Sequence, residues 1–207
     1  MILLTKKHND LNDYCDKVGI ENYSYWSRDI MAGSPYSNFI LTLLKHVVKY
    51  VAYIAGSFTM HNIKKLPIDF SAIDIIHSNT NRQDIGAYIS QKYGIKHIWH
   101  IREMGKEDYN VVFYKRKCIQ YMNRNTDLFV AISNVVRDKW VGLGIQNQKI
   151  ITIYDGMSVG QIRRRTGGEN NKIRIVMTGH VQPNKGQLQL VKAISILPLG
   201  YREIIEL

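Results

Sequence analysis

The strongest constraint on the fold is a regular alternation of short β-branched runs with helical patterns across residues 73–154. Apolar residues in adjacent positions are typical of buried strands, and apolar residues three and four positions apart are typical of helices. The predicted strands are 73–78, 96–101, 128–132 and 150–154, and the predicted helices are 84–93, 111–122 and 135–143. This alternation favours parallel βαβ units, so we predict an α/β fold with a Rossmann-like parallel sheet and flanking helices.

Polar or small residues follow each predicted strand. They are 78–80, 100–103, 133–134 and 155–156. Because ligands of parallel sheets bind beyond the carboxyl ends of the strands, we expect these residues to line one edge and to form a site there.

The rhythm breaks at residues 158–171, where glycines, asparagines and three consecutive arginines are typical of a linker. We therefore predict a first domain over residues 1–157, which lacks its first βα unit, and the start of a second domain over residues 172–207. Within the second domain, a strand over 172–177 and a helix over 187–196 are too few elements to bury a core.

An amphipathic helix is predicted over residues 39–58. Its apolar stripe consists of Ile40, Leu43, Leu44, Val47, Val51 and Ile54. Lys45, His46 and Lys49 interrupt the apolar run, which makes it a poor membrane span. We expect the stripe to face the protein core, and docking on an anionic membrane is the alternative.

The 207 residues carry 28 Lys and Arg against 17 Asp and Glu, a net charge of +11. Such a charge favours phosphate-bearing partners: nucleic acid, nucleotide or anionic lipid. The basic residues are dispersed and match no nucleic-acid-binding motif, so we expect no nucleic-acid partner. A dinucleotide-binding fingerprint is also missing, since Gly142 and Gly144 follow no strand.

The two cysteines, Cys15 and Cys118, lie far apart in the sequence. This separation is typical of buried apolar residues in a reduced cytoplasm.

Several motifs occur in order between residues 70 and 195. They are Ile73–Thr80 with Asp84 and Gly86, Trp99–Gly105 with Glu107 and Asp108, Thr126–Ser133, Tyr154–Met157, and Gly179–Gln187. Together they resemble the motifs of glycosyltransferase family 4 enzymes that act on bacterial surface polysaccharides. The resemblance implies a GT-B fold of two facing Rossmann-like domains, the first for the acceptor and the second for a nucleotide-sugar donor. It also implies retention of anomeric configuration without a metal or cofactor.

The resemblance assigns roles to residues of the first domain. His100 matches the family histidine beside the transferring sugar, and the alternative is a hydrogen-bonded histidine at a strand end. Arg102 and Glu103 would orient the acceptor or each other, and the alternative is a solvated ion pair of little energetic value. Asn79 and Thr80 would bind acceptor hydroxyls or cap the next helix.

In the second domain, Gly179, His180, Lys185 and Gly186 match the turn that meets the donor. Lys185 fits the lysine that contacts the diphosphate at a helix start, and the two glycines allow close backbone approach. His180 stands where the family usually has Arg, and a neutral imidazole binds a diphosphate less strongly.

We therefore expect a glycosyltransferase that joins a sugar from a nucleoside diphosphate sugar to a glycan or lipid-linked acceptor in cell-surface polysaccharide synthesis. It would be cytoplasmic and peripheral at the inner face of the plasma membrane. The family also has two Glu residues seven positions apart, which Glu203 and Glu206 do not match, so we expect this chain alone to be inactive. The alternatives are a non-catalytic half-enzyme that serves as a partner subunit and, less favoured, a basic nucleic-acid-binding module.

Overall fold

The computed structural model describes residues 1–33, 39–105, 111–156, 172–179, 181 and 185–206. They form two compact units, Met1–Asp155 and Gly156–Leu207. The predicted linker, residues 158–171, lies outside the described residues. The division of roles between an acceptor domain and a donor domain stays a prediction.

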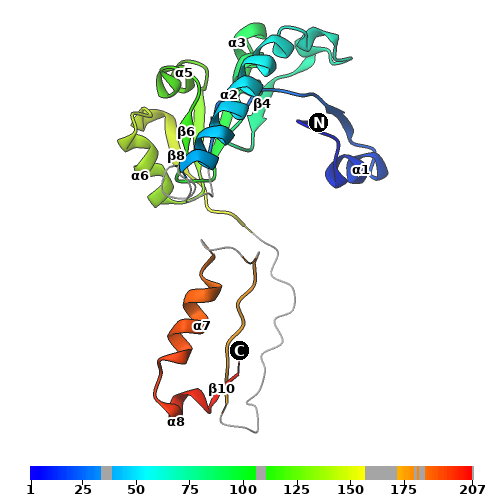
Figure 1. The fold of residues 1–207 in the computed structure, drawn as a ribbon. Coiled ribbons are helices and arrows are strands. Elements are labelled where there is room, and N and C mark those ends of the chain that lie inside the picture. Colours follow the sequence, from blue (N-terminus) through cyan, green and yellow to red (C-terminus); the bar gives the residue numbers. More distant parts are fainter. Residues whose placement is uncertain (34–38, 106–110, 157–171, 180, 182–184, 207) are drawn as a thin grey trace. The chain divides into compact units, whose positions relative to one another are not determined.

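Four parallel strands form the central sheet of the first unit, in the order β4-β5-β7-β8 (Figure 1). The strands are β4 (Ile75–Ser78), β5 (Lys96–Ile101), β7 (Leu128–Ala131) and β8 (Ile150–Thr152). The helices between them are α3 (Ile85–Tyr93), α5 (Cys118–Arg124) and α6 (Asn134–Gly142). The prediction of an α/β fold with a Rossmann-like parallel sheet and flanking helices is confirmed.

Local signals set the helix ends as predicted. Gly94 ends α3 in the left-handed region at φ 72°, and its N–H donates to the Ser90 carbonyl at 2.8 Å. The hydroxyl of Ser133 accepts a hydrogen bond from the N–H of Val136 at the start of α6. Gly86 lets α3 approach the sheet, since a Cβ there would lie 2.1 Å from Ser78 Oγ.

The predicted helix over residues 111–122 is wrong in its first half. Strand β6 (Val112–Phe113) pairs antiparallel with β3 (Met31–Ala32), and α5 begins only at Cys118. A β-branched and an aromatic residue favour a strand when a partner strand is present, and β3 comes from a distant part of the sequence.

The main core lies against one face of the sheet. Trp99, Ile101 and Phe129 on this face are fully buried and pack with Trp140 of α6 and Met122 of α5. Both free cysteines are buried, as predicted. The opposite face of the sheet is partly open among the described residues, because Ile75 and Ile151 are 56% and 43% exposed. His100 lies on this opposite face, since it alternates along β5 with Trp99 and Ile101.

Smaller elements complete the described chain. In the first unit, β1 (Ile2–Thr5) and β2 (Glu21–Ser24) pair in parallel on either side of α1 (Asp10–Lys17). Three 3₁₀ turns, η1 (Ile63–Lys65), η2 (Phe70–Ala72) and η3 (Asn147–Lys149), lie between larger elements. The second unit contains a parallel pair, β9 (Ile173–Arg174) with β10 (Ile205–Glu206), and two helices, α7 (Gln187–Ser195) and α8 (Leu199–Arg202).

Helix α2 (Phe39–Met60) contradicts the expected orientation of its apolar stripe (Figure 1). Its stripe is exposed instead of facing the core, with Leu44 at 56% and Val51 at 61% exposure. By length and composition α2 also qualifies as a membrane span, with 22 residues and mean hydropathy 1.4, although the lysines led us to expect a poor one. The helical period shows which residues share a face, but it does not determine whether that face packs on the core.

A buried ion pair fixes α2 against the rest of the unit. The Arg28 guanidinium donates to both carboxylate oxygens of Asp84, at 2.6 to 3.1 Å, and Asp84 is fully buried at the start of α3. Arg28 Nη1 also donates to Ser57 Oγ of α2 at 3.0 Å. The segment around Arg28 therefore ties α2 to α3.

Candidate active site

The carboxyl ends of the strands meet at one edge of the sheet. The register pairs Ile101 of β5 with Ala131 of β7, and Ala131 with Thr152 of β8. The residues that follow β5 and β8 therefore leave the sheet at the same level. This arrangement brings Arg102, which follows β5, together with Asp155, which follows β8.

His100 lies near this edge on the open face of the sheet. Its imidazole is half-buried and stacks on that of His77 from β4, with 5.7 Å between ring centroids and 14° between planes. Its Nε2 atom is buried and has no hydrogen-bond partner among the described residues. Burial first, and then the nearby Arg102 and His77, lower the pKa of His100 below its usual value of 6.5. The ring is therefore neutral at pH 7, with one nitrogen able to donate and the other able to accept.

Arg102 forms an ion pair with Asp155. The two side chains are 37% and 51% exposed, so the pair contributes little to stability. Its effect is to hold a guanidinium and a carboxylate beside His100. The contact described for the Arg102 guanidinium is with Asp155, and the prediction that Arg102 and Glu103 orient an acceptor or each other stays a prediction. Glu103 fixes the loop through its carbonyl, which accepts from Trp140 Nε1 at 2.8 Å.

Asn79 and Thr80 follow β4 at the same edge. Asn79 is exposed, while the Thr80 hydroxyl accepts from the N–H of Arg82 and its carbonyl accepts from Trp99 Nε1 at 2.7 Å. Neither residue caps the next helix, since the N-cap of α3 is Asp84. That alternative is therefore wrong, and contact with an acceptor hydroxyl stays a prediction for both.

Two residues at this edge, His77 and Asn81, were missed from the sequence, and the partner of a third, Asp155, was not predicted. His77 is exposed and stacks on His100. Asp155 lies within the motif Tyr154–Met157, which signalled its importance but not its partner. Asn81 is 1% exposed, and neither its Nδ2 nor its Oδ1 has a hydrogen-bond partner among the described residues. Buried amides are nearly always hydrogen-bonded, so Asn81 is a further candidate for contact with a ligand.

The predicted donor residues belong to the second unit. Gly186 is the N-cap of α7 with φ 84°, Gly179 has φ 140°, and Lys185 is exposed directly before the helix. Both glycines therefore adopt backbone conformations that other residues rarely adopt. His180 lies outside the described residues.

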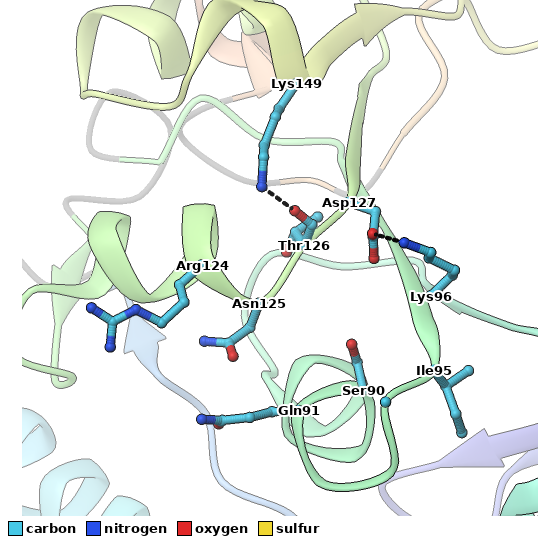
Figure 2. Close-up of a pocket in the computed structure, with 10 residues that line it drawn as sticks. Ser90, Gln91, Ile95, Lys96, Arg124, Asn125, Thr126, Asp127 and Lys149 are labelled. Atoms are coloured by element: carbon cyan, nitrogen blue, oxygen red, sulfur yellow. Dashed lines mark hydrogen bonds and ion pairs between the residues drawn. The ribbon is translucent and has the colours of Figure 1, made fainter.

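A pocket of about 410 Å³ opens at the opposite, amino-terminal edge of the sheet (Figure 2). Its two lysines already have partners: Lys96 pairs with Asp127 at 2.9 Å, and Lys149 donates to the carbonyls of Asn123 and Thr126. This pocket is separate from the carboxyl edge, where parallel sheets bind their ligands.

Comparisons with known proteins give a family and several distant solved structures. The sequence model of Glycosyltransferase Family 4 matches residues 35–161, more than half of the chain. No curated protein matches. Three crystal structures of Anabaena HepE are similar: with UDP and glucose (15% identity, TM-score 0.44), with UDP (13%, 0.48) and with UDP-glucose (14%, 0.45).

The aligned regions cover 75%, 75% and 94% of this chain, in the same order. They cover 37%, 36% and 42% of the HepE chains, so this chain spans about two fifths of their length or less. At these scores the structures add nothing to the case for the fold or the function, which stands on the family match and the sheet. The family match runs from α2 through β8 and includes every residue of the candidate site at the carboxyl edge. The chain belongs to glycosyltransferase family 4.

Proposed function

We propose that the protein transfers a sugar from a nucleoside diphosphate sugar to a glycan or lipid-linked acceptor, with retention of anomeric configuration, in cell-surface polysaccharide synthesis. Family membership supports the reaction class. The observation that carries the assignment of the site is His100 at the carboxyl edge of the sheet, whose buried Nε2 has no hydrogen-bond partner among the residues that the structure describes. An unsatisfied buried nitrogen costs free energy, and a substrate hydroxyl at this edge would relieve that cost.

The proposed reaction breaks the bond between the anomeric carbon and the diphosphate, which leaves with the electron pair. The acceptor oxygen forms the new bond and loses its proton to the departing diphosphate. Positive charge develops at the anomeric centre in the transition state, so a neutral imidazole beside it is more favourable than a charged one. His100 would hold a sugar hydroxyl by a hydrogen bond. The Arg102–Asp155 pair would present a donor and an acceptor to the second substrate.

Lys185, at the start of α7, is the proposed contact of the diphosphate. A helix N-terminus carries partial positive charge and unpaired N–H groups, which favour a phosphate. Gly186 keeps this turn free of a side chain. The net charge of +11 favours the same anionic ligand.

We further propose that the protein is cytoplasmic and acts at the inner face of the plasma membrane, where a lipid-linked acceptor would be available. The experiment is to incubate the full-length protein with a panel of nucleoside diphosphate sugars and membrane lipid extract. NMR would then give the anomeric configuration of the product. Transfer with retained configuration is expected, whereas inversion, or no turnover of any donor, would contradict the proposal.

A further inference from the structure

Helix α2 lies on the first unit with its polar side inward. His46 Nδ1 is 2.8 Å from Tyr114 Oη, and Ser57 accepts a hydrogen bond from Arg28. Gly56 is buried so tightly that a Cβ there would lie 2.8 Å from the backbone of Arg28. Met60 is also buried. Polar, small and buried residues thus form the side of α2 that contacts the protein.

The outward side of α2 is apolar over about 160° of the helix circumference, at 100° per residue. Its members are Ile40, Leu41, Leu43, Leu44, Val47, Val48, Val51, Ile54, Ala55 and Phe58. We call this set the apolar arc. Ala55 is exposed, and the other nine side chains are 41% to 72% exposed. The arc contains no charged residue, and this arrangement is the reverse of a helix that packs on a core.

An exposed apolar surface of this size marks an interaction site. The residues around one end of α2 favour a lipid bilayer as the occupant. Lys64 and Lys65 of η1, the turn that follows the helix, are both exposed, and Trp26 is 39% exposed, with its carbonyl accepting from Thr59 Oγ1. Trp at the level of the headgroups and Lys beside anionic phosphates are typical of membrane contact. The net charge of +11 has the matching sign.

The contacts of α2 also indicate how it would meet the bilayer. The helix is tied to the unit from His46 to Met60, which corresponds to about 21 Å of its length. Lipid cannot surround a helix held against a polar domain along that distance. Its arc can instead lie in the plane of the interface, inserted to about 5–10 Å.

We propose that α2 docks the protein on an anionic bilayer by inserting the apolar arc into the interfacial region. Lys45 and Lys49 are half-buried on the inward side, so the insertion depends on the arc and not on these two lysines. This inference rests on the proposed function in one respect: the lipid-linked acceptor proposed there would be located at a membrane. Vesicle binding itself needs no sugar chemistry.

The test compares two double variants of the full-length protein. Val48→Gln with Val51→Gln places two polar side chains in the arc, at positions that are 67% and 61% exposed. The matched control, Leu11→Gln with Val135→Gln, changes two apolar side chains of α1 and α6 that are 50% and 63% exposed. All four positions are on the surface, so both variants should unfold at the wild-type temperature.

Co-sedimentation with vesicles of phosphatidylcholine containing 30% phosphatidylglycerol gives the partition coefficient of each protein. We expect the arc variant to bind about 30-fold more weakly than wild type, and the control variant to bind as wild type does. Phosphatidylcholine alone should bind the wild type more weakly. Equal loss in both variants, or no binding by the wild type, would overturn the proposal. The proposal would also be overturned if the wild type were a dimer, the arc variant were a monomer, and both bound vesicles equally well. Titration with UDP-glucose in the same samples separates the two proposals, because loss of the arc should leave donor affinity unchanged.

Discussion

His97 makes the stability of the first unit depend on pH. The ring is fully buried at the start of β5, where Nδ1–H donates to the Asn125 carbonyl at 2.9 Å and Nε2 accepts from the Ser78 hydroxyl at 2.8 Å. Burial lowers the pKa of His97 from 6.5 to about 4. The unfolded chain therefore takes up a proton below pH 6.5, while the folded protein resists it until about pH 4.

The stability that His97 contributes is complete above pH 6.5 and is lost as the pH falls toward 4. The loss for this shift is about 3 kcal/mol at pH 4. Urea unfolding, followed by tryptophan fluorescence at pH 7.5 and pH 4, would measure the free energy of unfolding of the wild type and of His97→Gln. We expect the free energy of the variant to fall by about 3 kcal/mol less than that of the wild type, since other titrating groups cancel in the comparison. An equal fall in both proteins would refute the reasoning.

Three further substitutions test the packing. Arg28→Ala leaves the buried carboxylate of Asp84 without its main partner, and urea unfolding should show a loss of about 3–5 kcal/mol; a loss below about 1 kcal/mol would contradict the role of the pair. Gly86→Ala places a methyl group 2.1 Å from Ser78 Oγ, so calorimetry should show a lower Tm, corresponding to about 1–3 kcal/mol, and an unchanged Tm would be evidence against this close packing. Gly186→Ala forces φ 84° on a residue with a Cβ, so hydrogen exchange of the Leu190 amide, which donates to the Gly186 carbonyl, should be faster, with an opening free energy lower by about 1–2 kcal/mol; unchanged exchange would show that the turn is not strained.

The parallel sheet could be predicted because its strands and helices alternate with clear periods. The predicted ends of α3 and α6 agree with the structure because Gly94 and Ser133 set them through purely local chemistry. The error at residues 111–122 arose because β6 forms only with β3, about 80 residues earlier in the sequence. A pairing over such a separation leaves no local pattern. The sequence pattern also could not show that the apolar stripe of α2 faces away from the core, because this orientation depends on Arg28 and on the polar contacts of the inward side.

The candidate site could be predicted only in part. The motif around Trp99–Gly105 pointed to His100, and its place at the strand end follows from the predicted sheet. The partner of Arg102 depends on the register of three strands, which periodicity does not give. Strand alternation could have placed His77 on the same face as Ile75, but its position beside His100 also depends on the register of β4 with β5.

The rate of sugar transfer by the full-length protein would show whether His100 acts at the reacting sugar. His100→Ala would be compared with wild type and with His8→Ala, which changes an exposed histidine before α1. We expect the kcat of His100→Ala to fall by about 100-fold or more, with the KM for the donor little changed and His8→Ala at the wild-type rate. If His100→Ala transferred sugar as fast as His8→Ala, the carboxyl edge around His100 would not be the active site.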